Sequence, residues 1–385
     1  MFILSNGTMA TADKFKVLVI GGTGAQGLPV VRGLVNDKKY TCRILTRNPK
    51  SARAQSLLAL GNVELFEGSF VNEADLCKAY EGCDRAFVNI DGFNVGEKGE
   101  MYWAIRTFEL ALENGGIRFF VYGNLDYGYK KSGYSPEFRT GHYDGKGRIG
   151  EWILSQSKST HMGAALFTTG PYLEMAISER TPMAPVLEKD EKSGEDVLTW
   201  RVPLTDEGAV PHVALDDCGP YVRWLFDNPS RANGLNLEVA VEHVHYHDLA
   251  RAFTKVTGKP ARFIDVDFDT YWATGPMAYN QARPAAYSVP RDDLGVMTVR
   301  ENFTGFWTLW RNSGGNRGVI RRNYQLLDEI HPNRIKSAEE WFRREDEKGR
   351  NDGRGSLWDR VQNGNRRYIL KNHEDFLLPK QQANI

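Results

Sequence analysis

The stretch Lys16-Val-Leu-Val-Ile-Gly-Gly-Thr-Gly-Ala-Gln-Gly27 decides the fold of this chain of 385 residues. The apolar run near its start is typical of a β-strand buried on both faces of a sheet. Gly21, Gly24 and Gly27 follow with the spacing G-x-x-G-x-x-G, directly before an amphipathic helix expected over 27–36. These glycines permit a tight turn, and the helix N-terminus offers free N–H groups and a partial positive charge to an anion. Strand, turn and helix together predict a loop that binds the pyrophosphate of a dinucleotide.

Apolar strands and helical patterns alternate along the first 170 residues. Strands are expected at 16–20, 40–46, 62–66, 85–90, 117–122 and 162–169, and helices near 100–113 and 146–155. Continuous apolar strands that alternate with helices indicate a parallel sheet covered on both faces. Right-handed crossovers then give an α/β fold with a Rossmann-type, doubly wound sheet.

The residues after the second strand indicate which dinucleotide is bound. A site that prefers NAD usually places an acidic residue there, which accepts a hydrogen bond from the ribose 2′-hydroxyl. This chain has Arg47 and Lys50 instead. Because a guanidinium can bind a phosphate through two parallel hydrogen bonds, the sequence predicts NADP(H) as the cofactor.

The chain is expected to divide into four regions. Residues 1–14 form a disordered N-terminal tail, and residues 15–170 form the NADP-binding Rossmann domain. Residues 171–300 form a smaller substrate-side α/β region that contributes some sheet strands, and residues 301–385 form a helical C-terminal extension and tail. Within this extension, 348–367 is rich in glycine, arginine and asparagine, which predicts a flexible, loop-like segment.

Composition and charge exclude several classes of function. The 49 lysine and arginine residues balance the 49 aspartate and glutamate residues, so no general attraction to nucleic acid or to a membrane surface is expected. The four cysteines form no CxxC pair and are typical of reduced thiols in a cytoplasmic protein. The alternating His243, His245 and His247 lack a carboxylate or cysteine motif to complete a site, so no metal is expected.

Five motifs, taken together, resemble the NmrA-like family of atypical short-chain dehydrogenases. They are GGTGAQG at 21–27, LTRNP at 45–49, HYDGKG at 142–147, FTTGPY at 167–172 and VPHVALDDCG at 210–219. The resemblance covers about residues 15–345. Two C-terminal motifs, WTLW at 307–310 and IHPNRI at 330–335, resemble fungal members, many of which are similar to enzymes of secondary metabolism.

The resemblance implies which residues contact the phosphates of the cofactor. The pyrophosphate would be held by the loop residues Gly21, Thr23, Gly24, Ala25, Gln26 and Gly27. Arg47 and Lys50 would hold the 2′-phosphate.

The same resemblance places the two nucleoside halves. Gly68, Ser69 and Phe70 would lie along the adenine, although relatives often have aspartate in place of Ser69. Asn89 and Ile90 would lie near the adenosine ribose. On the nicotinamide side, Lys146 would bond the ribose, and Pro171 and Tyr172 would flank the ring.

The proton donor of ordinary short-chain dehydrogenases is missing from its usual place. Those enzymes use Tyr-x-x-x-Lys, in which the lysine lowers the pKa of the tyrosine so that its phenol exchanges a proton with the substrate oxygen. Lys146 fits the lysine, but His142 stands where the tyrosine is expected. Tyr143 is adjacent but displaced by about 100° around a helix.

Three interpretations of the chemistry therefore stay open. In the first, a reduced carbonyl is protonated by His142 or by one of the loop tyrosines Tyr127, Tyr129 and Tyr134. In the second, the substrate is an imine or iminium ion, which accepts hydride without an oxyanion partner. In the third, the protein catalyses nothing and senses the redox state of NADP.

We predict an NADPH-dependent reductase with Lys146, His142 and Tyr143 as catalytic residues. Its substrate would be a small metabolite, a cyclic imine or iminium ion or a carbonyl compound of a fungal natural-product pathway of the alkaloid type. The alternative is a non-catalytic regulator that senses NADP(H) and acts through a protein partner. A homodimer is left open, because Trp307 and Trp310 share one helix face that suits either a core or a dimer contact.

Overall fold

A seven-stranded parallel sheet forms the centre of the protein, with β1 (Phe15–Ile20) in its interior. The computed structural model describes residues 15–157, 160–366 and 369–370, so the expected N-terminal tail lies outside the described residues. The strand order is β10-β6-β5-β4-β1-β2-β3. The bounds are β2 (Tyr40–Thr46), β3 (Val63–Glu67), β4 (Arg85–Val88), β5 (Phe119–Leu125), β6 (Gly163–Thr169) and β10 (Asn236–Glu238). This order, which reverses at β1, is that of a Rossmann-type doubly wound sheet and confirms the predicted fold class.

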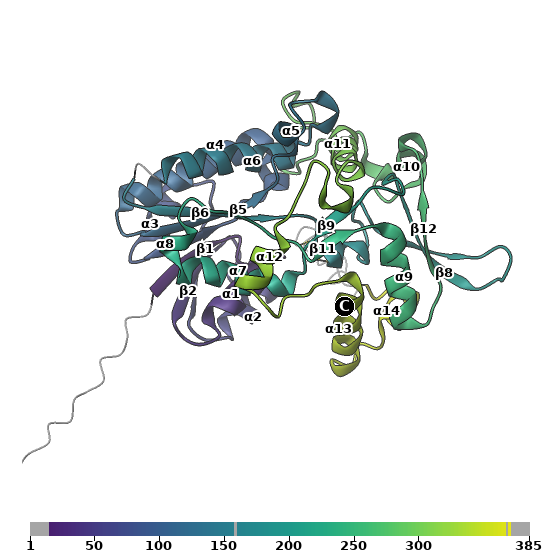
Figure 1. Ribbon diagram of the computed structural model, residues 1–385. Helices are drawn as coiled ribbons and strands as arrows, with labels where there is room; N and C mark the ends of the chain where they lie inside the picture. Colours follow the sequence, from purple (N-terminus) through teal and green to yellow (C-terminus); the bar gives the residue numbers. More distant parts are fainter. Residues whose placement is uncertain (1–14, 158–159, 367–368, 371–385) are drawn as a thin grey trace, which may run out of the picture.

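Helices cover both faces of this sheet (Figure 1). One face carries α1 (Gly27–Val35), α2 (Ala52–Leu58), α7 (Leu215–Asp227) and α8 (Pro229–Ala232). The other face carries α3 (Glu73–Tyr80), α4 (Gly92–Asn114) and α6 (Gly141–Gln156). The backbones of α1 and α7 are in contact where the two helices cross. A Cβ on Gly33 would lie only 2.7 Å from Cα of Gly219, so the close approach requires glycine. The apolar side chains of the sheet and of these helices thus form two hydrophobic cores, one on each face of the sheet.

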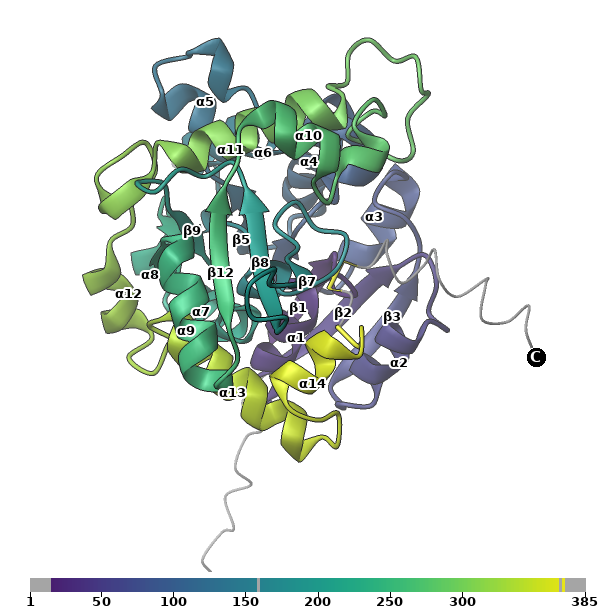
Figure 2. The same ribbon diagram turned by 90° about the vertical axis from the view of Figure 1, so that its right-hand side faces the viewer.

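A second, smaller layer stands beside the carboxyl ends of the sheet (Figure 2). It holds a three-stranded sheet of order β12-β8-β7 and a two-stranded ribbon of β11 and β9. Its strands are β7 (Val186–Lys189), β8 (Asp196–Val202), β9 (Val210–His212), β11 (Glu242–Val244) and β12 (Ala261–Asp265). Its helices are α9 (Tyr246–Thr257), α10 (Phe268–Thr274) and α11 (Val299–Arg311). A separate core rich in aromatic side chains holds this layer together, with Trp307 and Trp310 fully buried inside it. These two tryptophans are therefore core residues and not a dimer contact.

The remaining elements are short or C-terminal. Short elements are α5 (Gly128–Lys131), η1 (Pro136–Phe138), η2 (Leu173–Ala176), η3 (Ala278–Asn280) and η4 (Gly314–Asn316). The chain then continues through α12 (Tyr324–Ile330), α13 (Ala338–Asn351) and α14 (Leu357–Gln362). No helix among the residues described above is both long and apolar enough to cross a membrane.

The expectation of a loop-like segment over 348–367 is wrong. Helix α13 extends to Asn351, and α14 begins at a capping box in which Ser356 and Asp359 satisfy each other's backbone N–H groups. Leu357 and Val361 bury one face of α14. The segment has few apolar residues among many polar residues and glycines, so their helical spacing was not recognised in the sequence.

A buried ion pair joins the C-terminal extension to the sheet. Asp126, just after β5, accepts two hydrogen bonds from the Arg322 guanidinium, at 2.9 and 2.7 Å. Both side chains have no exposed surface, and Lys131 donates a third bond to Asp126 at 2.9 Å. These cations hold the pKa of the Asp126 carboxyl well below its usual range although burial opposes this.

Candidate functional site

A cavity of about 790 Å³ opens at the carboxyl ends of β1, β4, β5 and β6. Ligands of doubly wound sheets bind at this edge, where the strand order reverses. At one end the cavity is lined by the glycine-rich loop and by residues after β2 and β3, and we call this the cofactor end. At the other end it is lined by α4, α6, α11 and the segment 277–291, and we call this the substrate end.

The glycine-rich loop packs so tightly that only glycine fits at its two ends. Gly21 has φ +82°, and a Cβ there would lie 2.4 Å from the carbonyl oxygen of Asn89. A Cβ on Gly27 would lie 2.1 Å from the carbonyl oxygen of Gly21. Gly21, Thr23, Gly24, Ala25 and Gln26 line the cavity as expected, whereas Gly27 lies behind the loop and serves packing rather than contact. In the first turn of α1, the N–H groups of Leu28 and Val30 donate to the carbonyl oxygens of Gly24 and Gln26, and Pro29 has no N–H. The part of the backbone that faces the cavity, and so an anion, is therefore the loop before the helix.

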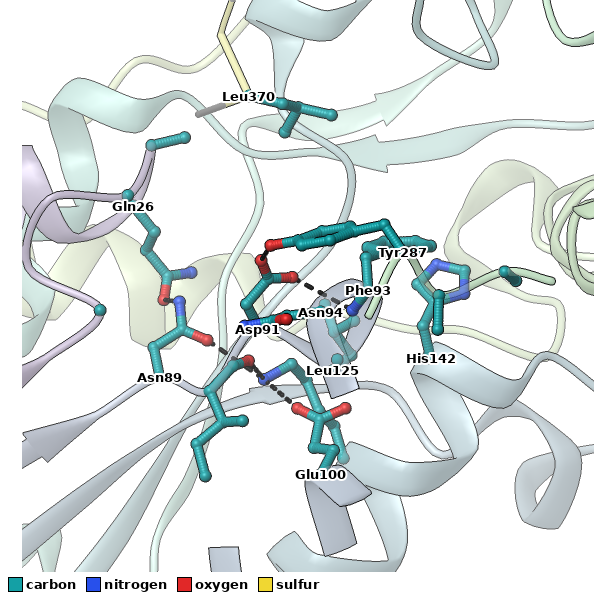
Figure 3. A pocket seen from close by; sticks show the side chains of 18 of the residues that line it. Gln26, Asn89, Asp91, Phe93, Asn94, Glu100, Leu125, His142, Tyr287 and Leu370 are labelled. Atoms are coloured by element: carbon teal, nitrogen blue, oxygen red, sulfur yellow. Dashed lines mark hydrogen bonds and ion pairs between the residues drawn. The ribbon is translucent and has the colours of Figure 1, made fainter. Parts of the chain in front are cut away.

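A chain of hydrogen bonds crosses the strand ends beneath the cavity (Figure 3). The Gln26 amide donates to Thr169 Oγ1 at 3.2 Å. The Asn89 amide donates to Gln26 Oε1 at 2.7 Å, and Lys146 Nζ donates to Asn89 Oδ1 at 3.1 Å. The loop, β4, β6 and α6 are thereby held in one polar network, which includes the predicted residues Gln26, Asn89 and Lys146.

Lys146 is fixed at the floor of the cavity by further contacts. Its Nζ donates to the carbonyl oxygens of Ile90 at 2.9 Å and Gly123 at 3.2 Å. It also lies 2.7 Å from a carboxylate oxygen of Glu100, whose side chain has no exposed surface. Burial raises the pKa of Glu100, and the Lys146 ammonium partly offsets this. No sequence motif pointed to Glu100, because its place depends on the kink at Gly96 inside α4, where φ is +72°.

His142 does line the cavity, in a setting that opposes its protonation. Its ring lies between Phe93, at 4.7 Å between ring centroids, and Phe303, at 5.5 Å. Its Nδ1 lies 3.0 Å from Oδ1 of Asn302. Burial lowers the pKa of His142 to about 4, and the nearby Lys146 ammonium acts in the same direction. The imidazole is therefore neutral near pH 7.

The tyrosines considered as proton donors have different positions. Tyr143 lines the cavity and packs against Trp310, and burial raises its pKa well above the usual range. The loop tyrosines do not line the cavity, so the expectation that one of them reaches the substrate is wrong. They pack on one another outside it instead: Tyr127, Tyr129 and Tyr134.

The residues expected to bind the adenosine half are only partly brought together. Arg47, Gly68, Ser69 and Phe70 line the cofactor end. Lys50 is exposed and does not line the cavity. Of the two residues predicted to hold a 2′-phosphate, only Arg47 therefore lies at the cofactor end. The chain turns away after Arg47, because Asn48 and Ser51 form the turn and the cap that start α2.

The Gly170-Pro171-Tyr172 turn after β6 is held from behind. His212 Nδ1 lies 3.1 Å from the carbonyl oxygen of Pro171, and the Val213 N–H donates to the same oxygen at 2.9 Å. A Cβ on Gly170 would lie 2.6 Å from the carbonyl oxygen of Pro211. The turn therefore presents Pro171 and Tyr172 to the cavity, where a nicotinamide was expected.

Residues 171–300 were expected on the substrate side, but the individual side chains that line the substrate end were not foreseen in the sequence. The wall of this end holds aromatic and aliphatic side chains from separate elements, with arginines at its rim: Phe93, Met175, Arg180, Met277, Arg283, Tyr287, Phe303 and Phe306. Tyr287 donates a hydrogen bond to Asp91, the residue that caps α4 (Figure 3). Leu370 also lines the cavity. These residues come together only through long-range packing, and they carry no local motif.

Two of the three alternating histidines, His243 and His247, are held by other contacts. His243 contacts the Tyr324 hydroxyl at 2.7 Å and the Ile320 carbonyl oxygen at 3.1 Å, and His247 pairs with Asp206. Across residues 15–157, 160–366 and 369–370, no group of three or more His, Cys, Asp or Glu side chains is placed to hold a metal ion.

Comparisons with known proteins agree with this geometry. A model of the NmrA-like family matches residues 13–289. An NmrA-like family domain-containing protein of Dictyostelium discoideum is 27% identical over 254 residues, which are 66% of this chain and 80% of that protein. The NmrA-like family domain-containing oxidoreductase himF of Aspergillus japonicus is 28% identical over 258 residues, 64% of this chain and 75% of that protein. The crystal structure of NmrA, a negative transcriptional regulator, in complex with NADP shares the fold: its TM-score is 0.58 at 16% identity, covering 86% of this chain and 94% of that one.

Proposed function

The chain belongs to the NmrA-like family, and on that premise we propose that it is an oxidoreductase that uses NADP(H) to reduce a small metabolite. The observation that carries the proposal is the continuous cavity that joins the glycine-rich loop to Lys146 and to the aromatic wall. An anion-binding loop at one end and a largely apolar chamber with a few polar groups at the other suit a dinucleotide and a smaller second ligand. The relative from Aspergillus japonicus, which is named an oxidoreductase, supports this chemistry.

The residues of the cofactor end fit a dinucleotide with a 2′-phosphate. The glycine contacts keep side chains out of the space between the loop backbone and a bound diphosphate. Arg47 is exposed at the same end, where its guanidinium can bind a phosphate through two hydrogen bonds. The NmrA structure, solved with NADP, supports this choice of cofactor.

Lys146 and the Pro171-Tyr172 turn would hold the nicotinamide half. When bound, the cofactor supplies the hydride. Lys146 Nζ has four acceptors for its three N–H groups at the cavity floor, so it would donate to a ribose hydroxyl in exchange for one of them, such as the Gly123 carbonyl oxygen at 3.2 Å. His212 and Val213 hold the turn rigid from behind, so that Tyr172 walls the site.

An iminium ion suits this site better than a neutral ketone. An iminium carbon that takes up a hydride becomes an amine carbon without any proton, whereas a reduced ketone is an alkoxide that must be protonated. His142 is neutral near pH 7 because its pKa is lowered to about 4, and the raised pKa of Tyr143 makes its hydroxyl a weak acid. Both residues therefore offer little to a developing alkoxide. We accordingly propose that the substrate is a cyclic iminium ion, or a cyclic imine that binds already protonated as the iminium, in a cytoplasmic enzyme.

NADPH consumption measured with a panel of cyclic iminium ions, imines, ketones and quinones tests the proposal. Turnover is expected with the iminium ions, and Lys146→Met is expected to lower kcat/KM by about 100-fold or more, as for loss of a positioned charged donor in an active site. Lys130→Met, which removes an exposed lysine paired with Glu151, is the matched control and should leave kcat/KM unchanged. Turnover of ketones alone would contradict the iminium assignment.

A non-catalytic sensor of NADP(H) is the second candidate. The replacement of the usual tyrosine by a neutral histidine favours it, and the NmrA structure with NADP belongs to a protein called a transcriptional regulator. The sensor predicts no turnover with any class of substrate, together with unequal dissociation constants for NADP⁺ and NADPH. Isothermal titration calorimetry with both forms of the cofactor separates it from the reductase.

A further inference from the structure

The His142 ring is placed where three helices meet at the substrate end (Figure 3). It extends from the first turn of α6, against Phe93 of α4 and Phe303 and Phe306 of α11. Asn302, also on α11, is almost fully buried behind the ring. The face of the ring is thus held by aromatic side chains, and its edge by a single amide.

Asn302 determines which nitrogen of His142 carries the proton. Asn302 Oδ1 lies 3.4 Å from the backbone nitrogen of His142, which can only donate, and 3.0 Å from Nδ1 of the ring. The opposite orientation of the amide would set Nδ2 against that backbone N–H, donor against donor. With the oxygen facing His142, Nδ1 must be the protonated nitrogen, and in a neutral ring Nε2 then carries a lone pair.

Nε2 is available to a ligand. It has no hydrogen-bond partner among the residues that the structure describes, and unlike several other polar atoms nearby it is not sealed from solvent. Because His142 lines the cavity, this lone pair is accessible from the substrate end. The low pKa of the ring keeps it an acceptor across the neutral range.

We infer that His142 Nε2 is a hydrogen-bond acceptor that selects substrates bearing an N–H or O–H group on a planar aromatic ring. This inference rests on the proposed function, because it assumes that the bound ligand is a substrate. It also makes His142 a hydrogen-bond acceptor, where the sequence had indicated a proton donor. The aromatic part follows from the wall, where Phe93 and Phe303 lie parallel within 2° at 6.1 Å and Phe306 is adjacent. Flat rings pack on such surfaces by offset or edge-to-face contact. Asn302 is a positioning residue, because it acts only through the tautomer of His142.

The tautomer can be measured in the full-length protein without any substrate. Nitrogen NMR of histidine labelled with ¹⁵N separates protonated from unprotonated ring nitrogens, and His142→Gln identifies the signals of His142 among the eight histidines. We expect a protonated Nδ1 and an unprotonated Nε2 at neutral pH, and the signals of the exposed His161 serve as a reference for a histidine in contact with solvent. Asn302→Asp is expected to raise the pKa of His142, since a carboxylate facing Nδ1 favours the imidazolium. A protonated Nε2 in the wild type would overturn the inference.

Paired ligands test the selection itself. The probes are dihydroisoquinolines with one phenolic hydroxyl at each ring position, each compared with its methyl ether, and binding to the NADP⁺-loaded protein is measured by calorimetry. At one position or more, the hydroxyl compound should bind about 10-fold more tightly, the equivalent of one neutral hydrogen bond. His142→Phe should remove this preference, and His142→Gln, which retains an acceptor oxygen, should keep part of it.

The outcomes separate this inference from the proposed function. A hydroxyl preference that depends on His142, without turnover of any probe, would support the acceptor and contradict the reductase. Turnover with no hydroxyl preference at any position, or with a preference that survives in His142→Phe, would contradict the acceptor and leave the reductase standing.

Discussion

The two ends of the cavity are built by different means. The cofactor end is made by short stretches directly after β1, β2 and β3, so that adjacent parallel strands place Gly24, Arg47 and Ser69 side by side. The substrate end is made by side chains from α4, α6 and α11, such as Phe93, His142 and Phe303, which are far apart in the chain. The first end depends on backbone geometry that a local motif specifies, and the second on tertiary packing. Substitutions should therefore affect them differently.

The largest effect is expected where the C-terminal extension is anchored to the sheet. Asp126→Leu leaves the Arg322 guanidinium buried without its carboxylate, which should lower the free energy of unfolding by about 3–5 kcal/mol. The double variant Asp126→Leu/Arg322→Met removes both charges and should recover much of this loss. Urea unfolding at neutral pH measures both. Equal losses in the single and double variants would show that packing, and not the charge, holds the extension.

The pH dependence of the same pair sharpens this test. Because the pKa of Asp126 is lowered in the folded protein, its contribution is present above the unfolded-state value of about 4 and is lost as the pH falls below it. The difference in unfolding free energy between the wild type and Asp126→Leu should therefore shrink in acid. Glu151→Gln, in an exposed pair with Lys130, should show a much smaller difference at every pH.

A smaller effect, confined to the cofactor end, is expected from Arg47. Arg47→Ala would remove the proposed hydrogen bonds to the 2′-phosphate and should weaken the binding of NADPH by about 10- to 150-fold, the range for hydrogen bonds to a charged group, while the binding of NADH changes little. Lys50→Ala is the matched control, because Lys50 is equally near in sequence but does not line the cavity. Fluorescence titration with both cofactors measures the ratio. If the substitution weakens the binding of NADPH and of NADH equally, the 2′-phosphate does not bind at Arg47.

The difference between local motifs and tertiary packing also explains which parts of the fold could be predicted from the sequence. The strands expected at 40–46 and 62–66 match β2 (Tyr40–Thr46) and β3 (Val63–Glu67) closely, because apolar runs and glycine turns are local signals. Residues 171–300 were expected to contribute some sheet strands, and β10 does join the main sheet, but β12 forms a separate sheet with β8 and β7. Strand pairing is a long-range choice, and the strand pattern alone does not reveal it.

Within the site, too, residues in local motifs could be predicted, whereas residues placed by long-range packing could not. Gln26, Asn89 and Lys146 lie together because each stands in a motif at a strand end or on the helix that follows it. Glu100 and Asn302 carry no motif, and their importance arises only once α4 and α11 are packed against α6. His142 was identified by its place four residues before Lys146, but its tautomer and its low pKa depend on that packing.

The smallest effect is expected at Tyr287, where the two ends of the cavity meet. The segment that carries it is held to the start of α4 by Tyr287 N–H to Phe93 O at 2.8 Å, by Ser288 N–H to Asn94 O at 3.0 Å and by the hydroxyl bond to Asp91. Tyr287→Phe removes the hydroxyl's bond to Asp91 and its contact with Arg47, both at a partly exposed side chain, so NADPH should dissociate about 2- to 5-fold faster. Tyr279→Phe, at a more exposed tyrosine of the same cavity, is the control and should not change the rate. Stopped-flow displacement measures both rates, and an unchanged rate in Tyr287→Phe would mean that the substrate-end segment does not retain the cofactor, so that the two ends act independently.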